Sequence, residues 1–161
     1  MSATDALETD ILELLFQNLD TTLDIGDATG LQGSTSAGSF WVALHTAIPD
    51  SPNEAPANQA VNEASYPGYA RVEVIRASSG SPNGGWTVSG NSVSNAAELA
   101  FGQHSGGSPA SQTVTHYSIG TSDSASPASE VLFFGALSSS LAVTSGITPR
   151  FSAGQLSITL D

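Results

Sequence analysis

The sequence lacks cysteine and lysine, carries few charges and contains no long apolar run. Without cysteine, the chain forms no disulfide framework and performs no thiol chemistry. Three basic residues stand against 15 acidic ones, for a net charge of −12. Proteins bind nucleic acids and anionic membranes through positive surface, so we expect neither as a partner. The first residues lack the basic and apolar regions of a signal peptide. A membrane-spanning helix needs about 18 or more consecutive apolar residues, and no run in the sequence is that long.

Motifs for catalysis and for cofactor binding are also missing. A nucleotide-binding P-loop needs lysine, and no G-x-S-x-G turn presents a serine to His104 or His116. His45 and His116, with Asp123, match no established metal-ligand spacing. Acidic residues in the segments 23–30 and 50–54 could bind calcium, but neither segment has the spacing of an EF-hand. We therefore expect a protein that is not an enzyme, with no catalytic residue, no metal site and no cofactor.

An amphipathic helix is predicted at the N-terminus, ending between residues 18 and 20. Thr4 is a suitable N-cap, and Asp5 and Glu8 place negative charge in the first turn. Apolar residues then recur at helical spacing. This apolar stripe either packs on the chain's own β domain or docks on a neighbouring subunit, and both alternatives stay open. The stripe consists of Leu7, Ile11, Leu14, Leu15 and Leu19.

From residue 40 the sequence changes to the pattern of strands. Strands are predicted at 40–46, in the alternating segment 69–77, and on both sides of the Gly90-Asn91 turn. Further strands are predicted near 99–101, 114–122, 131–137, 145–151 and the C-terminus, with a long surface loop at 50–67. The spacing favours an all-β, jelly-roll-like β-sandwich of eight to ten short antiparallel strands. We assign residues 1–32 to an N-terminal helical arm and linker and residues 33–161 to the β-sandwich domain.

Five sequence blocks carry a resemblance to a known family. FWVALHTAIPD, EASYPGYAR, VTHYSIGTS, VLFFGAL and SAGQLSITLD follow each other in the order found in small virion proteins of tailed bacteriophages. The chain resembles this family over nearly its whole length. The resemblance implies a structural virion protein that is made in the host cytoplasm, without saying which part of the virion it occupies.

Within that family we favour a capsid decoration (cement) protein on the outer surface of the head. The chain has no long shaft, and its acidic surface suits the outside of a shell filled with DNA. Its expected partners are the major capsid protein and further copies of itself, as a trimer or dimer. The alternative is a tail fibre or tail-tip domain that binds a host receptor. Tyr66 and Tyr69 flank a Pro-Gly turn, which is either a turn anchored by aromatic packing or a carbohydrate platform. The predicted subunit interface comprises Leu7, Ile11, Leu14, Leu15, Tyr66 and Tyr69.

Overall fold

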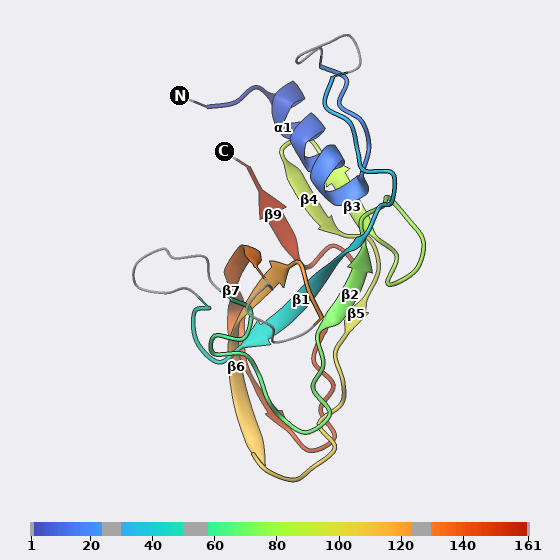
Figure 1. Cartoon of the computed structure of the whole chain (residues 1–161). Coiled ribbons are helices and arrows are strands. Elements are labelled where there is room, and N and C mark those ends of the chain that lie inside the picture. Colours follow the sequence, from blue (N-terminus) through green and yellow to red (C-terminus); the bar gives the residue numbers. More distant parts are fainter. Residues whose placement is uncertain (1, 24–29, 50–57, 124–129, 161) are drawn as a thin grey trace. The chain divides into compact units, whose positions relative to one another are not determined.

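The computed structural model describes residues 2–23, 30–49, 58–123 and 130–160 (Figure 1). Within these ranges the protein is mostly β: nine antiparallel strands form three sheets, and a helix precedes them. The all-β class and the N-terminal helix are confirmed, and the strand number lies within the predicted range. No helix in the described ranges is long and apolar enough to cross a membrane.

The chain forms two compact units, each built from separate segments of the sequence. Unit 1 contains Met1–Ser39, Val74–Leu99 and Phe151–Asp161, and unit 2 contains Phe40–Glu73 and Ala100–Arg150. The chain therefore passes from one unit to the other at 39/40, 73/74, 99/100 and 150/151. The assignment of residues 1–32 and 33–161 to an arm and a sandwich remains a prediction.

Unit 1 combines the helix with a three-stranded sheet. Helix α1 (Asp5–Leu12) continues as a π-helical turn at Glu13–Gln17, and Asn18 ends it in the left-handed conformation. Thr4 is the N-cap as predicted, because its hydroxyl accepts from the backbone N–H of Leu7 at 3.4 Å. The sheet has the order β3-β4-β9 and consists of β3 (Trp86–Ser89), β4 (Ser92–Asn95) and β9 (Ser157–Thr159).

The helix buries a different set of residues from the predicted stripe. Leu12 and Phe16 are fully buried, and the Phe16 ring meets Trp86 edge-on with centroids 4.9 Å apart. Asp10 is also buried, because its carboxylate accepts from the backbone N–H groups of Thr22 and Leu23 at 2.8 and 3.0 Å. Such backbone donors offset the cost of removing a charge from water. In the predicted stripe, by contrast, Ile11 and Leu19 are exposed, and Leu7, Leu14 and Leu15 are half-buried.

Unit 2 is built around most of a four-stranded sheet with the order β2-β1-β6-β7. Its strands are β1 (Ser39–His45), β2 (Val72–Ile75), β6 (Ser111–Gly120) and β7 (Val131–Thr144). The antiparallel register places Trp41 opposite Gly120 and His45 opposite His116. A two-stranded sheet pairs β5 (Leu99–Ala100) with β8 (Arg150–Phe151).

Three sequence predictions for this part of the chain need correction. Strand β7 continues to Thr144, well beyond the strand predicted at 131–137, because β6 pairs with it on both sides of an irregularity in register. Within the segment 145–151, where a strand was predicted, only Arg150–Phe151 (β8) forms one. The surface loop predicted at 50–67 contains no helix or strand in its described part, residues 58–67, but this part is not wholly at the surface, since Gln59, Ala64 and Tyr66 are buried.

Candidate functional site

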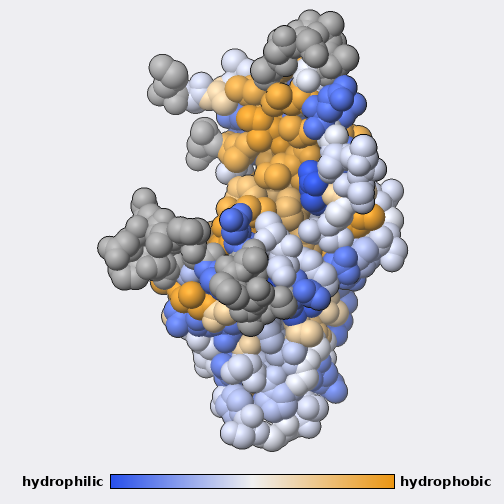
Figure 2. Space-filling view, in the orientation of Figure 1, coloured by the Kyte–Doolittle hydropathy of each residue, from blue (hydrophilic) through white to orange (hydrophobic). Residues whose placement is uncertain are grey.

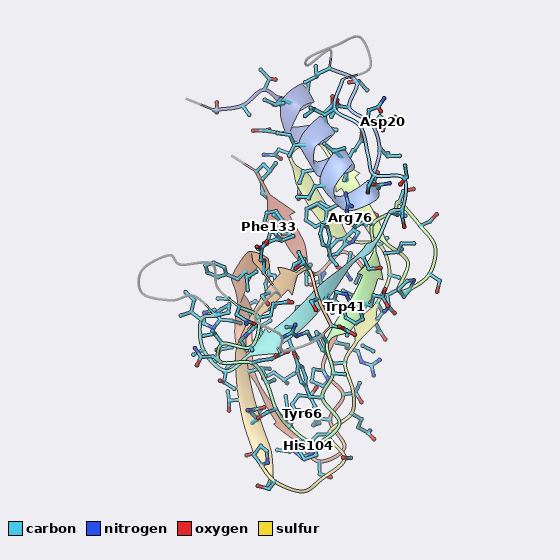
Figure 3. The ribbon with its side chains drawn as sticks, in the orientation of Figure 1. Asp20, Trp41, Tyr66, Arg76, His104 and Phe133 are labelled. Atoms are coloured by element: carbon cyan, nitrogen blue, oxygen red, sulfur yellow. The ribbon has the colours of Figure 1, made fainter. Side chains whose placement is uncertain are left out.

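Unit 2 contains a surface pocket with a volume of about 480 Å³. Strand β1 contributes Trp41, which Figure 3 labels, and the segment leading into β2 contributes most of the remaining wall. Asp123, which follows β6, completes the rim and is exposed. The volume lies in the range of about 300–1,000 Å³ that is usual for small-ligand sites. The lining residues are Trp41, Glu63, Ala64, Tyr69, Ala70, Arg71 and Asp123.

An ion pair between Arg71 and Glu63 forms the charged wall of this pocket. Arg71 Nε donates to Glu63 Oε1 at 2.7 Å, and Arg71 Nη2 donates to Glu63 Oε2 at 2.8 Å. The two side chains are 3% and 13% exposed, so water screens the pair weakly. The Tyr69 hydroxyl adds a further bond by donating to Glu63 Oε1 at 3.0 Å. The two parallel hydrogen bonds between Arg71 and Glu63 fix the planes of the guanidinium and the carboxylate, and so hold this wall of the pocket in one arrangement.

Behind the ion pair, a chain of polar side chains leads into the interior of unit 2. Arg71 Nη1 donates to Gln59 Oε1 at 3.3 Å, and Gln59 Nε2 donates to Ser118 Oγ at 3.1 Å. Ser118 Oγ lies 2.7 Å from His45 Nε2, and His45 Nδ1 lies 3.0 Å from the Val61 carbonyl oxygen. Gln59, Ser118 and His45 are fully buried. The network satisfies their polar atoms and connects the pocket wall to β1 and β6.

The network sets the charge states around the pocket. Burial alone would lower the pKa of Arg71, but its hydrogen bonds to Glu63 and the charge of that carboxylate raise it above the ordinary value. Burial, followed by the negative charge of Glu63, raises the pKa of Tyr69, so the phenol stays protonated and can donate. The pocket therefore presents a fixed cation and a neutral phenol, with Glu63 beside them and Asp123 at the rim.

His45 and Ser118 have the separation of a nucleophile and its base, yet their surroundings exclude catalysis. The Val61 carbonyl fixes the proton on His45 Nδ1, which leaves Nε2 to accept from the serine hydroxyl. Burial lowers the pKa of His45 and keeps the ring neutral. Both side chains are 0% exposed, so no substrate reaches the hydroxyl. The pair holds β1 to β6.

The other two histidines considered for metal binding or hydrolysis make hydrogen bonds within the fold. His116 Nδ1 lies 2.8 Å from Thr115 Oγ1, and His104 Nδ1 accepts from the backbone N–H of Gly106 at 2.9 Å. Among the described residues, no group of three or more histidine, cysteine or acidic side chains gathers as a metal site. Most of the acidic segment 23–30 and all of 50–54 lie outside the described residues.

The six predicted interface residues lie in different units. The four helix residues belong to unit 1, where Ile11 is exposed and Leu7, Leu14 and Leu15 are half-buried. Figure 2 shows hydrophobic side chains gathered over α1. Tyr66 belongs to unit 2 and is 1% exposed, stacked on His104 with its hydroxyl donating to the Gly102 carbonyl at 3.0 Å. Tyr69 lines the pocket. The role of these residues in an interface remains a prediction.

Sequence reasoning missed most of the pocket. The sequence predicts no functional role for Trp41, Gln59, Glu63 or Arg71. Arg71 is a weak signal, since an arginine within the predicted strand segment 69–77 needs a polar partner if it is buried. Gly120 is a second signal, because a side chain there would collide with Gln59.

Comparison with known families gives a match over nearly the full chain. A family model described as podophage GP4 fiber I protein gp80 matches residues 2–159, which include the pocket, α1 and all nine strands of the described ranges. No curated protein matches the sequence.

Proposed function

The chain belongs to the podophage GP4 fiber I protein family, and on this premise we propose that it is a tail-fibre domain that contacts the host surface. As a member of that family it is a structural component of a bacteriophage virion and not an enzyme. The family description names a fibre and gives no support to capsid decoration, so the alternative interpretation of the sequence becomes the preferred one. The observation that carries the proposal is the match from residue 2 to residue 159.

The structure of unit 2 supports a recognition role within the fibre. Its pocket combines half-buried Trp41 with the polar side chains of Glu63, Arg71 and Asp123. The buried network behind the pocket holds this wall in place before any ligand arrives, which reduces the entropy that binding would cost. A rigid polar surface with an aromatic residue is suited to repeated, reversible contact with a cell surface.

Unit 1 supplies a surface for assembly, and we assign its occupant as a second copy of this chain. The predicted stripe of α1 remains partly exposed and carries no charge. Copies of a protein with a net charge of −12 repel each other, so they meet most favourably where each surface is apolar and uncharged. Most oligomers of soluble proteins are symmetric assemblies of identical chains.

Competition for adsorption tests the proposed function. We expect the purified full chain, added in excess to host cells, to reduce the fraction of phage particles that adsorb. Unchanged adsorption at saturating protein, together with binding of the chain to purified fibreless heads, would contradict the proposal and favour a role in the capsid.

The assembly surface has a matched pair of variants. Ile11 is 38% exposed on α1 and Leu132 is 37% exposed on β7 in unit 2. If α1 mediates self-association, Ile11→Asp converts the oligomer to monomer in size-exclusion chromatography with light scattering, while Leu132→Asp leaves it unchanged. A wild-type chain that is monomeric at all concentrations, or that is dissociated only by Leu132→Asp, would contradict the assignment.

A further inference from the structure

The pocket in unit 2 has more hydrogen-bond acceptors and more negative charge than its ion pair uses. Glu63 and Arg71 balance each other through their two-point contact. Asp123 adds an exposed carboxylate on the rim and is close enough for its charge to raise the pKa of Arg71. The local charge of the lining residues is therefore −1, on a chain with a net charge of −12. A ligand that suits this pocket donates hydrogen bonds and carries no negative charge.

The second property of the pocket is aromatic surface next to these acceptors. Trp41 is half-buried and lines the cavity together with Tyr69. An indole offers a broad apolar face, on which the C–H groups on one side of a saturated ring can pack. Hydroxyl groups at the edge of such a ring can donate to carboxylate oxygens, and bonds to an ionised acceptor are stronger than bonds between neutral groups. One class of molecule has both an apolar ring face and an edge of hydroxyl donors: sugars.

We propose that this pocket binds a non-acidic sugar residue, with the ring against Trp41 and hydroxyl groups donating to Asp123. The inference rests on the proposed function, since it names the class of host-surface molecule that unit 2 would contact. Asp123 is the acceptor at the rim, whereas Arg71 and Glu63 shape the wall through their mutual bonds.

Other ligand classes fit the pocket less well. An acidic sugar or a phosphate would need a cation to receive it, but the guanidinium of Arg71 already donates to Glu63, to Gln59 and to the Ser122 carbonyl, the last at 2.8 Å. A metal ion finds no cluster of three ligands among the described residues. A quaternary amine would suit Trp41 and Asp123, but it has no hydroxyl group that could donate a hydrogen bond to the Asp123 carboxylate. The combination of features therefore favours a polyhydroxylated neutral ligand.

The pocket is also preorganised, because hydrogen bonds from neighbouring residues hold its polar lining side chains in place. The Tyr69 hydroxyl accepts from the Leu44 N–H at 3.1 Å while it donates to Glu63. Gln59 donates to the Trp41 carbonyl at 2.9 Å and so fixes the backbone of the aromatic residue. Weak single-sugar affinity is sufficient in a fibre, since several copies of a site on one particle multiply the effect.

The test is saturation-transfer NMR and calorimetric titration of the full chain with individual sugars. The probes are galactose, glucose, mannose and N-acetylglucosamine, with glucuronic acid as the acidic probe and choline as the amine probe. We expect at least one neutral sugar to bind, and Trp41→Ala to weaken that binding about tenfold, which corresponds to about 1.4 kcal/mol. Asp123→Ala, at an exposed position, should weaken it several-fold without affecting folding.

The matched control is Phe134→Ala, which removes an aromatic ring that is 45% exposed on β7, in the same unit and outside the pocket. Sugar binding should survive this change. Binding of glucuronic acid alone, binding of choline alone, or equal loss in the Phe134 variant would overturn the inference. So would an absence of sugar binding in a chain that still competes with the phage for adsorption, and in that case the proposed function would stand.

Discussion

Each compact unit uses one arginine to join separate chain segments, and the two arginines do so with different chemistry. In unit 1, Arg76 donates to the main-chain carbonyls of Leu14, Leu15 and Ala37 at 2.9, 2.6 and 2.9 Å. In unit 2, Arg71 is paired with a carboxylate. Burial lowers the pKa of Arg76, whereas Glu63 raises that of Arg71.

The difference indicates that Arg76 has a structural role, whereas Arg71 forms part of a surface that is preorganised for binding. Arg76 meets the carbonyls at the end of a helix, where the helix dipole is negative and the last carbonyls lack partners within the helix. Its bonds are used within the fold. Arg71 stands in the wall of a pocket, and its pairing with Glu63 leaves Asp123 available at the rim. Unit 1 is thus organised by apolar packing around Phe16 and Trp86, and unit 2 by a buried polar network.

The strongest test of this contrast is removal of the aromatic centre of unit 1. Trp86→Ala should lower the free energy of unfolding of unit 1 by about 3–5 kcal/mol, because it leaves a cavity against Phe16. Circular dichroism during urea unfolding measures the loss, and because the chain has two tryptophans, the fluorescence of Trp41 in this variant reports separately on unit 2. Thr87→Ala, at an exposed neighbouring position, is the control. A loss below 1 kcal/mol would mean that apolar packing does not organise unit 1.

The corresponding test in unit 2 removes one charge of the ion pair. Glu63→Gln should cost about 2–3 kcal/mol, because it leaves the buried guanidinium without its counter-charge. The double replacement Glu63→Leu with Arg71→Met should recover most of that loss, since an apolar pair no longer pays for desolvation. Chemical denaturation followed by tryptophan fluorescence measures both variants. Equal stability of the single variant and the wild type would show that the pair contributes shape alone.

A smaller effect is expected from pH, and it should arise in unit 2. Burial lowers the pKa of His45 below its ordinary value of 6.5, so the folded state binds its proton less readily than the unfolded chain. Its contribution to stability is present above about pH 6.5 and is lost as the pH falls toward the lowered pKa of the folded state. We expect thermal stability to drop between pH 7.5 and 5.5 in the wild type and to stay flatter in His45→Gln. Identical slopes in the two proteins would assign the pH dependence to other groups.

The smallest effect concerns the start of α1 in unit 1. Thr4→Ala should reduce the free energy of unfolding by about 0.5–1 kcal/mol, because it removes the hydroxyl that accepts from the Leu7 N–H. Thr4→Ser retains the hydroxyl and should behave like the wild type. Circular dichroism during urea unfolding measures both variants, and a loss shared by the serine variant would assign the effect to packing of the threonine methyl group.

Local patterns in the sequence were enough to predict most elements. The Gly90-Asn91 turn predicted the β3-β4 hairpin. The alternation around Val72 and Val74 predicted that both side chains are buried, and they are 7% and 0% exposed. These features depend on neighbouring residues along the chain, which is why they can be read from it.

Features that depend on distant partners could not be predicted in the same way. The burial of Asp10 depends on Thr22 and Leu23, which supply the backbone donors to its carboxylate. Gln59 and Arg71 are buried because Ser118, Ser122 and Glu63 meet them in the folded chain. The pocket combines residues from 41 to 123, and no local pattern indicates that they converge.

The most direct test of the central claim is the copy number of this protein in purified virions. Quantitative mass spectrometry against the major capsid protein gives the ratio, and gold-labelled antibody in electron micrographs gives the position. A fibre protein is expected in a small, fixed number of copies, with the label confined to the tail. A ratio near one per major capsid subunit, with the label spread over the head, would contradict the fibre assignment and restore the capsid decoration interpretation.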